Sequence, residues 1–261
     1  MRNLSLVFGI CGLCVALWWI FGWYLNNRCL TEEIEEIQDT VELQEVPSGD
    51  DKQLVISPND DEYLYWKYLR IPFLDVDLDD LKRQNRDTIG WIQVPGTYIN
   101  YPFVQYADNA YYLNHSFQKR KNNAGWVFLD YRNDFEKIDK NTIIYAHGLY
   151  DTILFGTLKN TMEPEWLEDT ENHVIRVSTE SHNSLWHVFS IYCIPNTSDY
   201  LVTEFKNEET YENFLQFVRG RSVYDFKIDI SSDDKTLTLS TCYSHTEKLV
   251  MHAKLIKLQT K

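Results

Sequence analysis

The chain has 261 residues, a formal net charge of −14 and a hydrophobic content of 44%. An acidic chain is unsuited to non-specific binding of DNA or RNA, which requires a basic surface, so we expect no nucleic-acid partner. Its 17 tyrosines, 13 phenylalanines and 8 tryptophans favour a β-rich fold, because aromatic side chains suit pleated surfaces. The length predicts one globular domain of about 200 residues behind a distinct N-terminal segment.

The first 25 residues differ from the rest of the chain. Residues 4–25 carry no charge and are long enough to cross a bilayer as a helix. A cleaved signal peptide is the alternative, but it would have a shorter apolar region followed by a small-residue cleavage site, which we do not find. We therefore expect residues 1–25 to be an uncleaved single-pass membrane anchor. Arg2 before the span and the acidic run 32–36 after it indicate a cytoplasmic N-terminus and an extracellular domain.

A polar and acidic stretch, residues 26–60, follows the predicted anchor. Ile34, Ile37 and Val41 have helical spacing and could form a short apolar stripe. The composition of the stretch favours the other interpretation, a solvated stalk or linker. From residue 61 the composition becomes globular, so we expect residues 61–261 to form the folded domain.

Eight short apolar runs separated by turn residues succeed one another in this domain. Runs of this length and spacing predict β-strands, and seven or eight of them indicate a mainly β barrel or sandwich. Helical patterns precede or interrupt the strands at about 75–85, 105–114, 152–160 and 205–219. The runs lie at 89–96, 99–106, 124–131, 141–148, 173–179, 185–195, 235–242 and 248–258.

The last two runs contain a candidate nucleophile. In a hairpin with a five-residue loop, Cys242 pairs with Lys248, and the apolar faces of the two strands match, with Leu239 opposite Met251. A slip of one residue would destroy this match. The pairing places an ammonium group beside the thiol, and a neighbouring cation favours the reactive thiolate.

The other cysteines provide a comparison for Cys242. Cys11, Cys14 and Cys29 lie in or next to the predicted span, and Cys193 lies among apolar residues in mid-strand, as expected of a core thiol. Cys242 ends its strand among polar residues. No cysteine spacing resembles a zinc site or a disulfide framework, and we expect no metal and no cofactor. These patterns leave open whether Cys242 is a nucleophile or a structural thiol.

A cysteine nucleophile usually requires a proton-handling partner, most often histidine. Among the seven histidines, His147 stands out because it follows an apolar strand and precedes Gly148 and a loop. A satisfied histidine at a strand end is the alternative, and the pattern does not decide between the two.

Several segments resemble one known family. The stretch TLSTC (238–242) is similar to the TLxTC signature of sortases, the membrane-anchored cysteine transpeptidases of Gram-positive bacteria, and 141–160 is similar to their histidine segment. Three further segments resemble class B sortases specifically, namely 90–117, 124–134 and 222–242. The resemblance extends in order over nearly all of residues 75–258.

This resemblance implies an eight-stranded sortase β-barrel with an N-terminal helical extension and a helix near 207–218, between the sixth and seventh strands. It implies that Cys242 attacks the carbonyl of a threonine in the C-terminal sorting signal of a surface protein or pilin, forming a thioacyl enzyme. An amine from a cell-wall precursor or a pilin lysine would then resolve this intermediate. His147 would protonate the departing amine and deprotonate the incoming one.

The chain departs from the family at the third catalytic residue. An arginine is expected at the start of the last strand, but Lys248 stands there and no arginine follows Cys242. Lysine supplies the charge without the planar five-donor fork, and losing one oxyanion donor can reduce a rate by about 10²–10³. Lys248 in an altered geometry, Arg221 as a substitute and weak activity are the possible outcomes. Charge and register favour Lys248.

Two further hypotheses compete with an active class B sortase. The missing arginine motivates a degenerate, non-catalytic sortase-like module for surface assembly. A papain-like hydrolase is disfavoured, because its cysteine precedes its histidine and begins a helix. The resemblance also implies substrate contacts at Asn109, Leu113 and Tyr200, and at Ser240 through its backbone.

Overall fold

The computed structural model describes residues 2–47, 68, 70–148, 153–242 and 246–261. Within these ranges, the side chains of residues 2–11, 19, 23–27 and 242 lie outside the described part. The chain divides into two compact units, Met1–Thr40 and Val41–Lys261.

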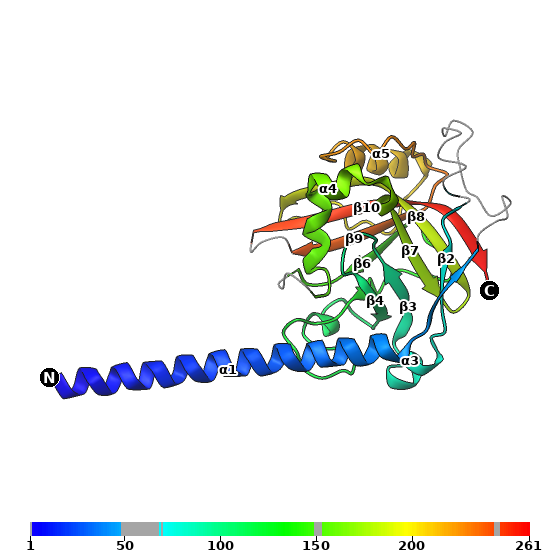
Figure 1. Cartoon of the computed structure of the whole chain (residues 1–261). Helices are drawn as coiled ribbons and strands as arrows, with labels where there is room; N and C mark the ends of the chain where they lie inside the picture. Colours follow the sequence, from blue (N-terminus) through cyan, green and yellow to red (C-terminus); the bar gives the residue numbers. More distant parts are fainter. Residues whose placement is uncertain (1, 48–67, 69, 149–152, 243–245) are drawn as a thin grey trace. The chain divides into compact units, whose positions relative to one another are not determined.

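In the described part of the second unit, eight strands form a closed barrel, as predicted (Figure 1). Each of them overlaps one of the eight apolar runs. The barrel strands are β3 (Thr88–Gln93), β4 (Asn100–Gln105), β5 (Phe128–Leu129), β6 (Asn141–Tyr145), β7 (Val174–Thr179), β8 (His182–Pro195), β9 (Thr236–Cys242) and β10 (Glu247–Thr260). Around the barrel their order is β10-β8-β7-β3-β4-β5-β6-β9.

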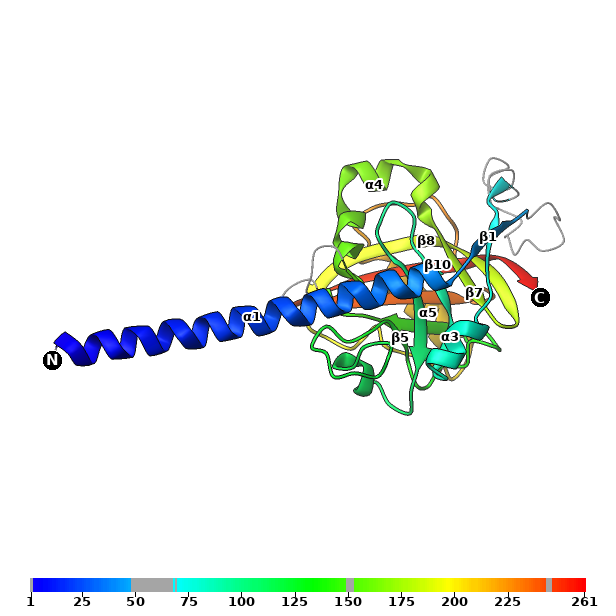
Figure 2. The same cartoon turned by 60° about the horizontal axis from the view of Figure 1, so that its bottom comes forward.

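Two pairs of neighbouring barrel strands are parallel, namely β4 with β5 and β6 with β9. The other described pairs are antiparallel, and the long strands β8 and β10 run side by side over most of their length (Figure 2). A parallel pair needs a long crossover, and the chain between β6 and β9 supplies it with two strands and several helices. Because β6 and β9 are parallel, their C-terminal ends lie at the same edge of the barrel.

The alternating pattern of the last two strands produces the core on that side of the barrel. Four apolar positions of β9 and β10 are fully buried, and burial of each such side chain stabilises the fold by about 1.5–3 kcal/mol. These positions are Leu237, Leu239, Leu249 and Met251.

Helix α5 (Glu208–Arg219) lies between β8 and β9, the sixth and seventh barrel strands, as the resemblance implies. A reciprocal capping box begins it. The Asn207 side chain accepts a hydrogen bond from the Thr210 amide at 2.9 Å, and the Asn207 amide donates to Thr210 Oγ1 at 3.2 Å. Its apolar face is buried through Tyr211, Phe214, Leu215 and Val218.

Two loops differ from the predicted elements. The helix expected over 105–114 is limited to the 3₁₀ turn η2 (Tyr111–Leu113), because β4 continues to Gln105 and Asp108 Oδ1 accepts from the amides of residues 110 and 111. A side chain that satisfies these amides favours a tight turn. The helix expected at 152–160 is the 3₁₀ helix η3 (Gly156–Met162), and residue 152 lies outside the described residues.

The strand expected over 124–131 is also shorter than predicted, since β5 has only two residues. Gly125 has a φ of +62°, and a Cβ there would lie 2.3 Å from the Tyr112 carbonyl oxygen. The same carbonyl accepts a hydrogen bond from the Trp126 amide at 2.9 Å. This close approach to the η2 loop excludes regular strand geometry before residue 128.

The chain before β3 contains regular structure on both sides of the undescribed residues. Helix α1 (Arg2–Thr40) continues beyond the predicted anchor into the predicted linker. Strand β1 (Leu43–Val46) pairs antiparallel with β2 (Phe73–Val76), and helix α3 (Asp79–Gln84) precedes the barrel. Short helices α4 (Pro164–Glu168) and η4 (Thr170–His173) follow η3.

Among the described residues, none of the helices has a segment apolar and long enough to span a bilayer. Many side chains of the predicted anchor, residues 1–25, lie outside the described part. The anchor therefore stays a prediction.

Candidate active site

The hairpin that carries Cys242 has the register expected from the sequence. Cys242 pairs with Lys248, and Leu239 pairs with Met251. On its other side Lys248 pairs with Ile194 of β8, so its backbone lies between two barrel strands. The Cys242 side chain and residues 243–245 lie outside the described part, so the structure places the nucleophile candidate through its backbone.

The parallel pairing of β6 and β9 brings His147 and Cys242 to one edge of the barrel. Tyr145 lies opposite Ser240, and the Ala146 amide donates to the Ser240 carbonyl at 3.4 Å. His147 is two residues beyond Tyr145, just as Cys242 is two residues beyond Ser240. If this register continued beyond Tyr145, the last residue of β6, the two candidates would lie beside each other, although they are far apart in sequence.

The His147 imidazole is held by the backbone of the η2 loop. Its Nε2 lies 2.9 Å from the carbonyl oxygen of Leu113, which only accepts hydrogen bonds, so Nε2 is the donor. Nδ1 then carries the lone pair that can receive a proton. Leu113 is 41% exposed, and its contact with the substrate stays a prediction.

Two of the predicted substrate residues contact each other instead of solvent. Tyr200 is fully buried, and its hydroxyl lies 2.8 Å from the Ser240 hydroxyl. Ser240 lies in an interior strand, and its carbonyl already accepts the Ala146 amide. The substrate contacts proposed for Tyr200 and for the Ser240 backbone stay predictions.

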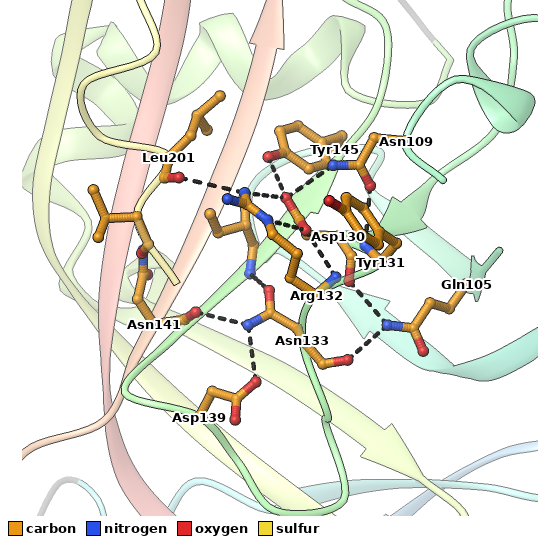
Figure 3. Close-up of polar contacts among 12 residues, drawn as sticks. Gln105, Asn109, Asp130, Tyr131, Arg132, Asn133, Asp139, Asn141, Tyr145 and Leu201 are labelled. Atoms are coloured by element: carbon orange, nitrogen blue, oxygen red, sulfur yellow. Dashed lines mark hydrogen bonds and ion pairs between the residues drawn. The ribbon is translucent and has the colours of Figure 1, made fainter. Parts of the chain in front are cut away.

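The fourth predicted substrate residue, Asn109, belongs to a polar cluster that the sequence did not reveal (Figure 3). Its Nδ2 donates to Asp130 Oδ2 at 2.9 Å, and its Oδ1 accepts from the Tyr131 amide at 3.0 Å. Burial opposes the ionised form of Asp130, but hydrogen bonds from Arg132, Tyr145 and Asn109 outweigh it and lower the pKa of this carboxyl. The order Asp-x-Arg directly after a strand was the available sequence signal for this ion pair.

Among the cations considered from the sequence, Arg221 is committed elsewhere. Its guanidinium donates to both carboxylate oxygens of Asp199, at 2.8 and 2.6 Å, and lies 3.9 Å from the centroid of the Phe217 ring. Such a bidentate, stacked pair agrees with a structural role. Lys248 is half-buried and adjoins Cys242 in the register, which leaves it as the cation best placed for the chemistry.

Cys193 has the properties expected of an inert thiol. It is half-buried in β8, and burial together with the nearby Glu247 carboxylate raises its pKa to about 11. The thiol therefore stays protonated and poorly nucleophilic at neutral pH. Within the described residues, no group of three or more His, Cys, Asp or Glu side chains could hold a metal ion.

Comparison with known proteins agrees with this geometry. Residues 92–256 match the model of the Sortase domain. Sortase B of Listeria monocytogenes is 34% identical over 184 residues, covering 69% of this chain and 74% of the relative. A Staphylococcus aureus sortase B–substrate complex superposes with a TM-score of 0.64 at 32% identity, over 69% of this chain and 84% of that one. A sortase B complexed with triglycine gives a TM-score of 0.64 at 31% identity, over 69% and 85% of the two chains.

The closed eight-stranded barrel carries a cysteine at the end of β9 and a histidine just beyond the neighbouring parallel strand β6, and the matches above show that the chain belongs to the sortases. Within them it is a class B sortase, a cysteine transpeptidase.

Proposed function

We propose that this class B sortase cleaves the C-terminal sorting signal of a surface protein at a threonine carbonyl and transfers the acyl group to an amine. His147 Nδ1 takes the proton of the Cys242 thiol, and the resulting thiolate attacks the carbonyl carbon. The amide C–N bond then breaks as His147 gives that proton to the departing nitrogen. In the second half, the incoming amine attacks the thioester carbon and loses a proton to His147. The Cys242 thiolate leaves and takes this proton back from His147, which restores the enzyme.

The parallel register of β6 and β9 is the observation that carries this proposal. Adjacent strands of a sheet are about 4.8 Å apart, so residues two positions beyond Tyr145 and Ser240 can bring an imidazole within reach of a thiol. The hydrogen bond from His147 Nε2 to Leu113 supports Nδ1 as the proton-handling atom. Lys248, which pairs with Cys242 across the hairpin, supplies positive charge where an oxyanion develops.

The accepting amine belongs to a cell-wall precursor or to a pilin lysine. A related sortase B is complexed with triglycine, a peptide with a free amine, and this supports an amine nucleophile of the first kind. A competition between triglycine and a peptide with a lysine side chain as its only free amine measures the preference. Predominant transfer to the lysine would favour pilus assembly instead.

The catalytic proposal is tested with the full chain in mild detergent. We expect a library of sorting-signal peptides to yield a thioacyl adduct, seen as a mass increase on Cys242, which triglycine then discharges. Cys242→Ala and His147→Ala should form none. If no peptide gives an adduct on Cys242, the catalytic proposal is wrong, and the non-catalytic surface assembly module motivated by Lys248 replaces it.

Residues 4–25 are proposed to hold the enzyme in the plasma membrane, with the N-terminus in the cytoplasm and the barrel outside. Their uncharged sequence supports this arrangement, and so does the need to meet exported substrates. Protease added to intact cells should digest the barrel and spare an N-terminal tag. A barrel that is digested only after the cells are lysed would contradict the proposed orientation.

A further inference from the structure

Asp130 is a fully buried carboxylate with an unusual number of hydrogen-bond donors. Arg132 binds it bidentately, Nε to Oδ1 at 2.8 Å and Nη2 to Oδ2 at 2.7 Å, and the Arg132 amide donates to Oδ1 at 3.0 Å. Oδ2 also accepts from the Tyr145 hydroxyl at 2.8 Å and from Asn109 Nδ2 at 2.9 Å. We call Asp130, Arg132, Tyr145 and Asn109 the Asp130 cluster (Figure 3).

Each hydrogen-bond partner of Asp130 lies in, or is bonded to, a segment that carries a predicted site residue. Tyr145 is the last residue of β6, two residues before His147. Asn109 lies in the loop that leads to Leu113, whose carbonyl accepts the hydrogen bond from His147.

The third link from Asp130 passes through the Arg132 side chain. Its Nη2 also donates to the Leu201 carbonyl at 3.3 Å, and Leu201 follows Tyr200, the partner of Ser240. Three segments that are distant in sequence are therefore linked to Asp130, two of them directly and the third through Arg132.

This arrangement exceeds what stability alone requires. This ion pair contributes little net stability, because the desolvation of Asp130 offsets part of the attraction and the Arg132 side chain, which is 36% exposed, is screened by solvent. A bidentate Arg–carboxylate pair does, however, fix distance and direction, and buried charges that are fully hydrogen-bonded give a rigid centre. The rigid centre here is hydrogen-bonded to Tyr145, on the strand that leads to His147, and to Asn109, in the loop that leads to Leu113, the partner of His147.

We propose that Asp130 and Arg132 are positioning residues for the transpeptidation. Through Tyr145 and Asn109, Asp130 fixes the position and orientation of the His147 ring. Through Leu201, Arg132 fixes the position of the loop that carries Tyr200. The inference rests on the proposed function of Cys242 and His147. A change at Asp130 or Tyr145, which act on His147, should affect the chemical step. A change at Arg132, which acts on the loop with Tyr200, should affect substrate binding.

The test compares pairs of tyrosine and aspartate variants in the full chain. Tyr145→Phe removes one hydroxyl from the Asp130 cluster, and Tyr211→Phe removes a buried hydroxyl that donates to the Lys140 carbonyl at 2.6 Å, away from the site. Asp130→Asn and Asp139→Asn form the second pair, since Asp139 accepts from Asn133 Nδ2 at 3.0 Å outside the cluster. The readouts are kcat, KM, the thermal midpoint and the rate at which iodoacetamide alkylates Cys242.

We expect Tyr145→Phe to lower kcat about tenfold with KM changed less than about twofold, while Tyr211→Phe lowers only the thermal midpoint. Asp130→Asn should lower kcat further, and Asp139→Asn should not lower it. Arg132→Lys, which keeps the charge and loses the fork, should mainly raise KM, by about fivefold. Alkylation of Cys242 should stay within about twofold of the wild type in all five variants, because the thiol itself is undisturbed.

Two results would overturn the inference. One is a kcat within twofold of the wild type for both Tyr145→Phe and Asp130→Asn. The other is a fall in kcat that Tyr211→Phe and Asp139→Asn share in proportion to their thermal midpoints, which assigns a purely structural role. A wild-type chain that forms no adduct on Cys242 is a different failure, since it removes the proposed function itself.

Discussion

His147 and His252 are held in opposite tautomers by their hydrogen-bond partners. His147 donates from Nε2 to a backbone carbonyl. Within the barrel wall, the single proton of the Thr238 hydroxyl goes to Asn141 Oδ1 at 2.7 Å, so the Thr238 oxygen accepts from His252 Nδ1 at 2.8 Å. His252 Nε2 then accepts the Tyr192 hydroxyl at 2.8 Å. One imidazole therefore offers Nδ1 for chemistry, and the other has both nitrogens occupied.

These assignments predict distinct nitrogen resonances. In ¹⁵N-labelled protein at pH 8, long-range ¹H–¹⁵N correlation spectra should show His147 protonated on Nε2 and His252 protonated on Nδ1. The variants His147→Gln and His252→Gln identify the two signals. A spectrum in which His147 is protonated on Nδ1 would contradict the hydrogen bond to Leu113 and the proton path proposed from it.

Lys248 allows a sharp prediction, because charge and geometry can be varied separately. Lys248→Ala removes the cation beside Cys242 and should lower kcat/KM about 10²-fold, as expected for loss of one oxyanion donor. Lys248→Arg should raise kcat/KM, since the guanidinium adds a planar fork to the same charge. Lys137→Ala, which removes an exposed lysine paired with Asp134, is the control and should have no effect. Full activity of Lys248→Ala would exclude Lys248 from the site.

At the residue scale, the sequence singles out candidates whose residue type and position suggest chemistry, but not groups that only the folded geometry reveals. Cys242 and His147 stand at strand ends, which makes them candidates, and it is the resemblance to sortases that implies their roles. Asp130 and Arg132 look like ordinary polar residues of a turn, and only the folded chain shows that Tyr145 and Asn109 converge on them. Convergence of distant segments leaves no local pattern to find.

At the element scale, the strands were predictable because barrel strands bury one face and therefore alternate apolar and polar residues. The register of β9 with β10 follows from matching apolar faces, and the pairing of Leu239 with Met251 confirms it. β5 and η2 were not predictable in detail. Their shape depends on the contact of Gly125 with the Tyr112 carbonyl, a tertiary approach that overrides local propensity.

Helix α5 offers a test of local stability without an effect on catalysis. Asn207→Ala removes the side-chain cap on the Thr210 amide and half of the capping box, which should lower the free energy of unfolding by about 1 kcal/mol. Urea unfolding measures the change, and kcat/KM should remain that of the wild type. Asn207→Ser, which keeps a capping oxygen, should recover most of the loss. An equal loss in both variants would show that the cap contributes little.

At the scale of the whole molecule, a chain of buried polar side chains crosses four neighbouring barrel strands, including both strands of the β9–β10 hairpin. It runs from Asn141 of β6 through Thr238 of β9 and His252 of β10 to Tyr192 of β8. Each member satisfies the next, so this wall of the barrel contains a continuous set of hydrogen bonds where apolar packing would be usual. Such a chain holds only while His252 is neutral, because a protonated Nε2 cannot accept from Tyr192.

That requirement predicts how the barrel responds to acid. Burial, with a smaller contribution from Arg221, lowers the pKa of His252 from 6.5 to about 3. Between these values the unfolded chain binds a proton that the folded chain does not, so stability is lost as the pH falls through this window. Asp130 affects stability at lower pH than His252 does. Its lowered pKa gives stability that is complete above 3.8 and lost only below it.

The two groups can therefore be separated by urea unfolding between pH 6.5 and pH 4. In that window, the free energy of unfolding of the wild type should fall more steeply than that of His252→Gln, by about 1.4 kcal/mol per pH unit. The slope is the quantity to read, since the substitution also changes the absolute stability through the lost contact with Tyr192. Asp130→Asn should leave the slope in this window unchanged and alter it only in stronger acid. Parallel curves for the wild type and His252→Gln would mean that His252 is protonated in the folded barrel, and the chain of hydrogen bonds from Asn141 to Tyr192 could not then be intact.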